Sequence, residues 1–593
     1  MTFCRRDVTV NSAGSREVSG REWSLLVAKS MSDGPWYPTV EEHSDEVGYR
    51  FFAGRLTRRK ASDALPSGFM LTHAAGDQWN FDESEPDGSW IALKFDRTQD
   101  QVSIASDMRV HQRWFYGHHE GAWYFSNSLV FLCQVAGGTF NIERRAIPYV
   151  LMFGHVPGRI TPLTNVSTLL PGEVVSVSAG QMRHEWRTRL RVTRTITDQT
   201  EHDISPKVWN KSAEGILVHI REAVRDELVG IGEIVLPLSG GMDSRFLLGC
   251  ALDFLPHDRI VTYTFGDPRT LDSQIARGLA RRLGIKHVPV AMDRRPVDEI
   301  CADGFEHTEG MAPVFPNSPL GPDRKALLKP RTYVLSGYNG DHAFGSRDVD
   351  DYDPGHNTGD FLFKMALKRA SGSYEKEVLP LLASHRWDEL GYEELIRATP
   401  GNTLAEKFER WHYEFHCTTR LHYHLFVFRT RAYYLTPFTH RSLWDYALTL
   451  PEAVRQRQRG YFMAMKLGYP NLYNYSTTRR MGLSANVQSR TVLRMRKAWR
   501  VGMNKLDDAI WKSTGLSVYF DPKQVYGHRR DLRQSQYHSA VAECIEYLKQ
   551  TPAFEPKGLD ALLFRYRKRL PVSTHILRAL FTVREWERQY GSN

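Results

Sequence analysis

The chain of 593 residues is long enough for several domains, since about 150 residues per domain is a common size. Hydrophobic residues make up 41% and charged residues 25% of it, which is typical of a folded globular protein and excludes disorder over most of the length. The formal net charge of +10 permits anionic ligands such as nucleotides or nucleic acid but selects none of them.

The cysteines and the lengths of the apolar runs indicate in which cellular compartment the protein is expected. The six cysteines are scattered and form no CxxC pair, which argues against a disulfide framework and against a thiolate zinc site. The first thirty residues carry several charges and no apolar signal segment, and no apolar run reaches the ~18 residues that a membrane span needs. We therefore expect a cytoplasmic protein that is not inserted in a membrane.

The first 200 residues predict an antiparallel β structure. Short segments rich in aromatic and β-branched residues are separated by Gly, Asp or Asn, which is the pattern of strands joined by hairpins. These segments cover residues 90–95, 101–105, 113–116, 122–126 and 173–178. The polar stretch 195–206 is expected to be a linker.

From residue 213 the pattern changes to strands that alternate with helices. Helices are expected over 213–228, from Ser244 to about 252, and over 272–283, and strands over 233–238, 259–265, 286–290 and 332–336. Such alternation predicts a parallel sheet with helices on its faces. From about residue 360 onward the pattern is mainly helical and rich in aromatic residues.

A glycine-rich motif, LSGGMDS over residues 238–244, lies between a predicted buried strand and a helix start. At such a junction backbone N–H groups point at an anion, and Gly240 and Gly241 let the backbone approach a phosphate closely. No Lys follows the glycines, so this is not a Walker A loop. A carboxylate among phosphate contacts needs a cation, so Asp243 is interpreted as a magnesium ligand. The alternative is a plain Gly-Gly turn with Asp243 as a helix cap.

This motif resembles the pyrophosphate loop of ATP pyrophosphatases, and residues 334–345 resemble the second motif of the asparagine synthetase family. The resemblance implies that ATP and Mg²⁺ are bound, with Asp243 and Asp341 as the two magnesium ligands. It assigns the nucleotide contacts to Leu238, Ser239, Gly240, Gly241, Asp243, Ser244, Thr264, Phe265, Asp272, Ser336 and Gly337. His342 departs from the pattern of that family, which usually has Glu there.

Segments 88–96, 106–107 and 125–129 resemble the glutaminase domain of the same family, and residues 169–172 resemble the motif that closes it. The resemblance implies two domains of mixed α/β class. Residues 1–200 would be an Ntn-type antiparallel β-sandwich with helices, and residues 207–593 a parallel-sheet ATP pyrophosphatase domain with a large helical extension. Active glutaminases carry a nucleophilic Cys directly after the initiator Met. Here Thr2 takes that position and Cys4 is internal, so we expect an inactive glutaminase domain.

The resemblance implies that three side chains take part in the reaction. Tyr338 stands where β-lactam synthetase has Tyr and asparagine synthetases usually have Glu, and with a carboxylate partner it would take a proton from an attacking amine. The alternative for Tyr338 is an aromatic wall against the substrate. Lys466 and Arg480 match family cations that would stabilise charge on the leaving pyrophosphate, and solvated surface charges are the alternative. The candidate carboxylate partners are Glu375, Glu377, Glu389 and Glu414.

Within this family the sequence is most similar to lasso peptide cyclases. That resemblance implies adenylation of an Asp or Glu side chain of a precursor peptide, followed by macrolactam closure by the N-terminal amine of that peptide. A leader peptidase and a leader-binding protein are the implied partners. The aromatic stretch 411–434 and the departures from the family over 436–445 suit a pocket for a large peptide. The alternatives are a β-lactam synthetase-like or asparagine synthetase-like ligase of a small amino acid and, with less support, a tRNA-modifying ATP pyrophosphatase. We expect no nucleic-acid partner.

Two further features have no assigned role. His412 and His416 share a helical face near His422 and His424, but no familiar zinc pattern is completed there, so a core or pocket-lining role is favoured over a metal. Residues 490–505 alternate basic and apolar side chains, which predicts a solvated amphipathic helix face. Binding of an acidic peptide or a nucleic acid is the alternative for that face.

Overall fold

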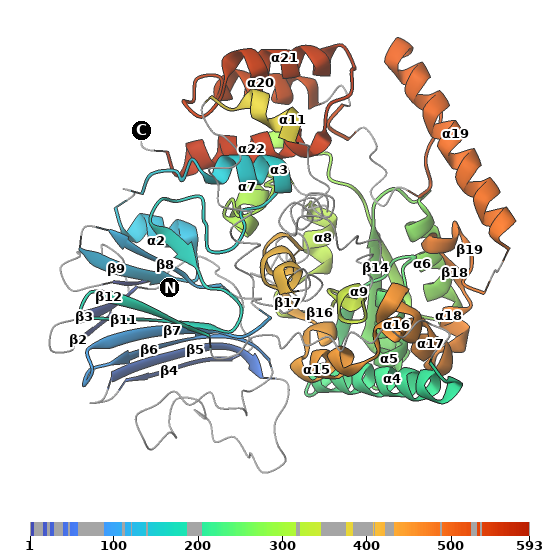
Figure 1. Cartoon of the computed structure of the whole chain (residues 1–593), viewed down its shortest axis with the longest axis horizontal. Coiled ribbons are helices and arrows are strands. Elements are labelled where there is room, and N and C mark those ends of the chain that lie inside the picture. Colours follow the sequence, from blue (N-terminus) through green and yellow to red (C-terminus); the bar gives the residue numbers. More distant parts are fainter. Residues whose placement is uncertain are drawn as a thin grey trace.

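The computed structural model describes residues 88–109, 113–119, 121–137, 140–186, 204–315, 321–345, 375–383, 407, 410–421, 432–486, 489–523, 531–533 and 537–591, together with the backbone of five strands before residue 57. Within these ranges the side chains of residues 341, 375, 415, 416, 419–421, 452 and 531 lie outside the description. A β-sandwich, a parallel sheet with its helices and a group of helices above them make up the described fold (Figure 1).

Two six-stranded sheets form the amino-terminal part, with the strand orders β10-β8-β9-β1-β3-β2 and β12-β11-β7-β6-β5-β4. All the strand pairs within them are antiparallel, and β1 lies between β9 and β3. The strands are β1 Thr2–Cys4, β2 Arg16–Ser19, β3 Ser24–Ala28, β4 Thr39–Ser44, β5 Gly48–Leu56, β6 Gly88–Asp96, β7 Gln101–Ser106, β8 Phe115–His119, β9 Ala122–Ser126, β10 Val166–Thr168, β11 Glu173–Ser178 and β12 Gln181–Trp186.

The two sheets share one apolar core, which makes them a sandwich. Ile91 and Ile104 from one sheet and Tyr116 and Phe125 from the other belong to the same buried cluster. The strands predicted at 90–95, 101–105, 122–126 and 173–178 are confirmed, and the strand predicted at 113–116 begins two residues later, at Phe115. The predicted linker lies mostly outside the described residues, and helix α4 begins at its end, at Pro206.

A five-stranded parallel sheet forms the centre of the second part. Its strands are β13 Ile234–Pro237, β14 Ile260–Phe265, β15 Lys286–Val290, β16 Thr332–Leu335 and β17 Ala432–Leu435, in the order β15-β14-β13-β16-β17. The first four of these strands were predicted. Strand β17 was not, because its four residues lie in a stretch whose composition indicated helix.

Helices cover both faces of this sheet, because successive side chains of a strand point to opposite faces. On one face, Ile234 and Leu335 pack against α4, α5, α6, α15 and α17. On the other face, Val235 and Val334 pack with Leu328 after α8 and with Cys417 of the helical segment His412–Leu421. The helices are α4 Pro206–Leu228, α5 Asp243–Leu252, α6 Leu271–Arg282, α8 Pro322–Leu327, α9 Gly340–Ala343, α15 Arg441–Thr449, α16 Glu452–Arg455, α17 Arg459–Gly468 and α18 Pro470–Tyr473.

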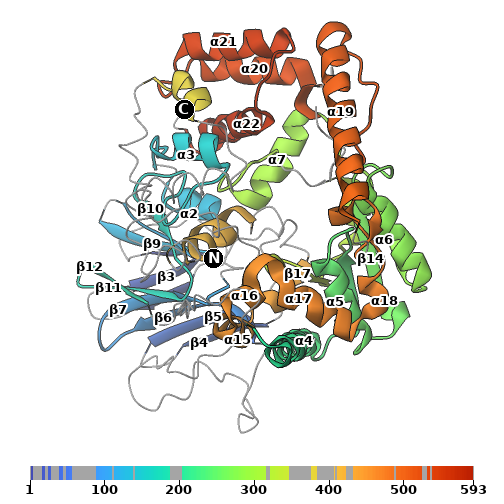
Figure 2. The same cartoon turned by 45° about the vertical axis from the view of Figure 1, so that its right-hand side comes forward.

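Helices from distant parts of the chain gather in one group above the sandwich and the parallel sheet (Figures 1 and 2). Its members are α2 Leu129–Val135, α3 Ala146–Phe153, α7 Val297–Thr308, α11 Glu375–Val378, α20 His538–Leu548, α21 Pro556–Arg567 and α22 Thr574–Gln589. One buried cluster contains residues of α3, α7 and α22 together. The last helix therefore packs against the amino-terminal part, a contact that no sequence pattern predicted.

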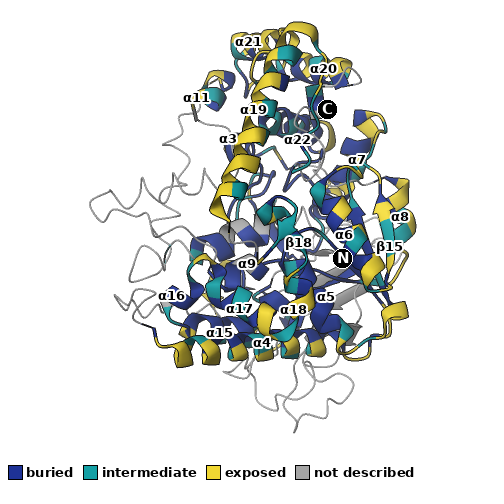
Figure 3. Cartoon of the chain, turned by 90° about the vertical axis from the view of Figure 1, so that its right-hand side faces the viewer, coloured by how far each residue is buried: buried dark blue, intermediate teal, exposed yellow. Residues whose placement is uncertain are grey.

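Helix α19, Arg490–Thr514, stands apart from the sheets (Figure 1) and is exposed over much of its length (Figure 3). Asp507 is its one buried residue. The predicted amphipathic helix over 490–505 is therefore confirmed, with its basic and apolar side chains largely in solvent. Among the described residues, no helix has the length and apolar character that crossing a membrane requires.

Candidate functional site

The strand order places two loops side by side at the carboxyl end of the parallel sheet. The order β15-β14-β13-β16-β17 reverses between β13 and β16, and ligands of open α/β sheets bind where the order reverses. The glycine-rich loop 238–242 follows β13, and residues 336–339 follow β16. The predicted phosphate loop and the predicted second motif are thus neighbours in space at the expected position.

Hydrogen bonds inside the glycine-rich loop fix its shape. The Oγ atom of Ser239 accepts a 3.1 Å bond from the Gly241 amide, and the Oγ atom of Ser244 accepts a 3.2 Å bond from the Ser239 amide. The Gly240 amide donates a 2.7 Å bond to Oδ1 of Asp272, from the first turn of α6. Burial raises the pKa of Asp272. The structure therefore gives Asp272 a role in holding the loop, and its predicted nucleotide contact remains a prediction.

Residues after α18 close around the same loop. The Thr478 amide and the Thr477 hydroxyl donate bonds of 3.1 Å and 3.0 Å to the Gly240 carbonyl. Arg480 lies in the same short helical turn as Thr478 and is half-buried. The predicted cation is thus brought close to the predicted phosphate loop, from a segment more than two hundred residues away.

Arg245 joins these two segments, and sequence reasoning missed it. Its buried guanidinium donates to the carbonyls of Leu472, Tyr475 and Ser476, at 3.0, 3.3 and 2.6 Å. Burial lowers the pKa of Arg245 to about 10. The sequence offers one indication of this role, which is that Arg245 follows the SGGMDS motif directly and precedes an apolar helical stretch. A charged residue on a buried helix face needs polar partners.

The second motif packs directly on Asp243. A Cβ atom on Gly340 would lie 2.9 Å from Oδ1 of Asp243, and one on Gly337 would lie 3.2 Å from the Ser244 amide. Asp341 follows Gly340 in α9, so its backbone is near Asp243, while its side chain lies outside the described residues. The structure brings the two predicted motifs together at Asp243.

Tyr461 also contacts this carboxylate, and no sequence pattern indicated this contact. Its hydroxyl donates a 2.9 Å hydrogen bond to Oδ1 of Asp243 from the first turns of α17. Lys466, near the end of the same helix, is exposed. An aromatic residue in a helical stretch carries no sign of such a role, so only the fold could reveal it.

Tyr338 is buried, with 3% of its surface exposed. Its hydroxyl donates a 2.6 Å bond to the Cys417 carbonyl, and burial raises its pKa well above the ordinary value. A protonated phenol that donates to a carbonyl is not poised to accept a proton, so the base role remains a prediction. Of the four candidate partners, Glu414 is buried on the same segment as Cys417, Glu377 is half-buried, and the side chains of Glu375 and Glu389 lie outside the described residues.

The remaining predicted nucleotide contacts lie at neighbouring strand ends. Thr264 and Phe265 end β14, and the Thr264 hydroxyl donates to the Leu238 carbonyl. Ser336 follows β16, and its hydroxyl accepts a 3.3 Å bond from the Tyr338 amide. These residues lie at the carboxyl ends of β14 and β16, beside β13, and their nucleotide contacts remain predictions.

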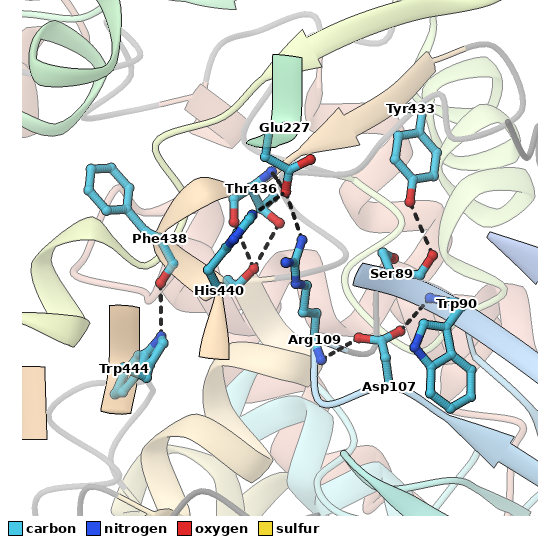
Figure 4. A network of polar contacts seen from close by, with 11 residues as sticks. Ser89, Trp90, Asp107, Arg109, Glu227, Tyr433, Thr436, Phe438, His440 and Trp444 are labelled. Atoms are coloured by element: carbon cyan, nitrogen blue, oxygen red, sulfur yellow. Dashed lines mark hydrogen bonds and ion pairs between the residues drawn. The ribbon is translucent and has the colours of Figure 1, made fainter. Parts of the chain in front are cut away.

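A buried polar network joins the sandwich to the parallel sheet beside this site (Figure 4). Arg109 donates a 2.7 Å bond to Glu227 at the end of α4, and the same Glu227 oxygen lies 3.1 Å from Nε2 of His440. Asp107 accepts from the amides of Trp90 and Arg109. His440 lies in segment 436–445, where the sequence departs from the asparagine synthetase pattern. Through Glu227 and Arg109 this segment is connected to the sandwich.

The donor set fits ATP and Mg²⁺. A Cβ atom at position 240, 337 or 340 would lie within 3.2 Å of Thr478, Ser244 or Asp243, so glycine there lets the loops pack closely against one another. The start of α5, where backbone N–H groups have no partner within the helix, is the place that favours an anion. Asp243 offers a half-buried carboxylate at the start of α5, and oxygen ligands of this kind are preferred by Mg²⁺.

Known proteins match part of the chain. No curated protein matches the chain. Among solved structures, it is similar to glutamine phosphoribosylpyrophosphate amidotransferase from B. subtilis, complexed with ADP and GMP, at 12% identity, over 59% of this chain and 65% of that chain, with a TM-score of 0.18. It is also similar to a structure described as the allosteric regulatory enzyme of purine biosynthesis, at 12% identity, over 59% and 64% of the two chains, with a TM-score of 0.19.

The chain thus spans slightly less than two thirds of the length of these two solved proteins, and an overall likeness this low carries no argument. The family comparison is more informative. Residues 216–467 match the family described as asparagine synthase. This range contains the glycine-rich loop, the second motif and Tyr461, and ends before Arg480. The similarity to the asparagine synthase family thus covers residues 216–467.

Proposed function

We propose that this protein is an ATP-dependent amide ligase that activates a carboxylate as its adenylate and transfers the acyl group to an amine, with release of AMP and pyrophosphate. The asparagine synthase domain supports an ATP-dependent ligase. The observation that carries the proposal is the meeting of the two motifs at the reversal of strand order, where the backbone at Gly337 and Gly340 packs on Asp243.

In this proposal the residues around Asp243 bind the nucleotide. The backbone at the N-terminus of α5, directly after the glycine-rich loop, would contact phosphate oxygens. Asp243 and Asp341 would hold Mg²⁺, which when bound neutralises charge on the phosphates. Arg480 and Lys466 would face the leaving pyrophosphate. Tyr461 would hold the Asp243 carboxylate in one orientation.

We propose a precursor peptide as the acyl substrate, with its own N-terminal amine as the nucleophile, so that the product is a macrolactam. Three features support a reshaped acceptor site compared with asparagine synthetases. His342 replaces Glu in the second motif, Tyr338 replaces Glu nearby, and segment 436–445 is anchored to the sandwich through His440. A small amino acid in place of the peptide is the main alternative.

The proposal assigns no glutamine hydrolysis to the sandwich. Phe3 precedes Cys4 in strand β1, so the Cys4 nitrogen belongs to a peptide bond and is not the free amine that an N-terminal nucleophile needs as its base. A cytoplasmic location, a leader peptidase and a leader-binding protein belong to the same proposal.

Mass spectrometry of reactions with ATP, Mg²⁺ and candidate precursor peptides tests the proposal. We expect the peptide to lose one water while AMP and pyrophosphate appear in equal amounts. Asp243→Asn should abolish this turnover, and Asp253→Asn, at the other end of α5, is the matched control that should retain it. Formation of ADP would contradict adenylation, and turnover with small amino acids alone would favour the alternative substrate.

A further inference from the structure

A buried cluster of metal-ligand side chains includes one residue of the second motif. It consists of His342, His412 and Cys417, whose ligand atoms all lie within 4.8 Å of one another. All three side chains are buried. His342 comes from α9, and the other two from the helical segment His412–Leu421. None of them is a ligand in the proposed binding of ATP and Mg²⁺.

The separation of the two imidazoles is that of ligands on one ion. Their Nε2 atoms are 3.2 Å apart. Two nitrogens at the usual 2.0–2.1 Å from a tetrahedral zinc ion are about 3.3 Å from each other. A hydrogen bond between two neutral imidazoles has a similar length, so the distance alone does not decide between the two.

The backbone of the segment supplies a second, independent observation. Residues 412–421 form a π-helix, a rare conformation that recurs at functional sites. In an α-helix, residues five apart point about 140° away from each other. In a π-helix the backbone bonds join residues five apart, so Cys417 comes to the same side as His412. The unusual winding is what places the thiol beside the imidazoles.

We propose that His342, His412 and Cys417 bind a zinc ion. Two imidazoles and one thiolate are ligands that zinc prefers and magnesium does not, so this site is chemically separate from the carboxylates at Asp243. The Cys417 thiol loses its proton to solvent when the ion binds. A tetrahedral ion keeps one further position for water or another donor.

The ion would connect two segments that form the proposed active site. His342 follows Asp341 directly, and Cys417 contributes the carbonyl that accepts from Tyr338. The same segment is tied to the sandwich, because the Tyr413 hydroxyl donates a 3.0 Å bond to the Met108 carbonyl. The zinc ion would therefore hold the second motif in a fixed place relative to the sandwich.

The scattered cysteines argued against a thiolate zinc site, and the sequence favoured a core role for His412. Both expectations rested on the spacing of Cys and His residues along the sequence. The cluster instead combines one thiol and one imidazole five residues apart with an imidazole seventy residues earlier. Spacing rules detect ligands on one short segment, and this site depends on the fold.

Metal analysis of the full-length purified protein tests the proposal without any substrate. We expect about one zinc per chain after dialysis against zinc and removal of loosely bound metal. Cobalt in place of zinc should give a thiolate-to-cobalt charge-transfer absorption. His342→Gln, His412→Gln and Cys417→Ser should each lose the metal. Cys301→Ser, which changes another buried free thiol, should keep it.

Three results would overturn the proposal. They are substoichiometric zinc in the wild-type protein, cobalt binding without the thiolate absorption, and full zinc content in Cys417→Ser. If the variants do not fold, the wild-type protein still decides, because a chelator should lower its melting temperature and zinc, but not Mg²⁺, should restore it. The outcome is independent of whether the protein ligates peptides, since no reaction is measured.

Discussion

The hydroxyl of Tyr461 donates a 2.9 Å hydrogen bond to Oδ1 of Asp243, across 218 residues of sequence. A carboxylate at the start of a helix can rotate, and this bond restricts it. A similar pair lies at the other end of the same helix, where the Tyr469 hydroxyl donates to Asp253. Two tyrosines, one in α17 and one directly after it, thus hold the aspartates at the two ends of α5, and only the first pair faces the second motif.

These two pairs give a matched test. Tyr461→Phe should lower kcat/KM for ATP about fivefold, since one hydrogen bond to an ionised group of about 1 kcal/mol or more is lost. Tyr469→Phe should leave it unchanged. ATP–pyrophosphate exchange measures both. Equal effects of the two substitutions would mean that Tyr461 acts through general packing and not through Asp243.

The close approach of Gly340 to Asp243 predicts a steric effect. In Gly340→Ala the new Cβ would lie 2.9 Å from Oδ1 of Asp243 and 2.9 Å from the Phe438 ring, so one of them must move. We expect loss of ATP-dependent turnover with the fold retained, as measured by circular dichroism. Gly232→Ala is the control, because nothing lies within 4 Å of its added Cβ. Wild-type activity of Gly340→Ala would contradict the packing of the second motif on Asp243.

Tyr338→Phe distinguishes a base from a structural contact. Because the hydroxyl donates to the Cys417 carbonyl inside the core, we expect a loss of about 1 kcal/mol in stability and a lower melting temperature. Single-turnover amide formation should slow no more than the adenylation step. Selective slowing of amide formation would instead support proton transfer by Tyr338.

Glu227 is expected to contribute to the joint between sandwich and sheet. It accepts from Arg109 at 2.7 Å with both side chains buried, so Glu227→Gln leaves a buried guanidinium without its counter-charge. The free energy of unfolding should fall by about 3 kcal/mol. Glu233→Gln changes an exposed carboxylate just before β13 and should cost much less. Equal denaturation midpoints for the two variants would argue against an energetic role of the network.

Glu173 should make stability depend on pH in the acid range. Burial favours its neutral form, but bonds from His184 at 2.8 Å and from Arg159 outweigh this and hold its pKa below the ordinary 4.5. The stabilisation is therefore present above pH 4.5 and is lost as the pH falls through the lowered pKa.

Glu173→Gln should thus lower the melting temperature at neutral pH, and its difference from wild type should shrink below pH 4.5. Glu185→Gln, on the neighbouring strand, changes a largely exposed carboxylate and serves as the control. A difference between Glu173→Gln and wild type that stays constant down to the acid transition would contradict the lowered pKa.

The sequence by itself determined the local elements and the two motifs. Alternating strands and helices from residue 213 predicted the parallel sheet, because the apolar periods of 2 and 3.6 residues are set by local geometry. The glycines at 240 and 241 predicted a close approach of the backbone to a phosphate, because glycine has no side chain in the way. The short strand β17 was not predicted, since four apolar residues within a stretch that indicated helix show no strand period of their own.

The tertiary structure alone decided which distant residues meet. The contacts that define the site join residues far apart in sequence. Tyr461 and Arg245 meet partners around the glycine-rich loop, Glu227 links the two parts of the chain, and Cys417 lies beside His342. Such contacts arise from the strand order and from the packing of helices on the sheet. No periodicity records them, because the residues concerned look like ordinary core or surface positions until the fold brings their partners within reach.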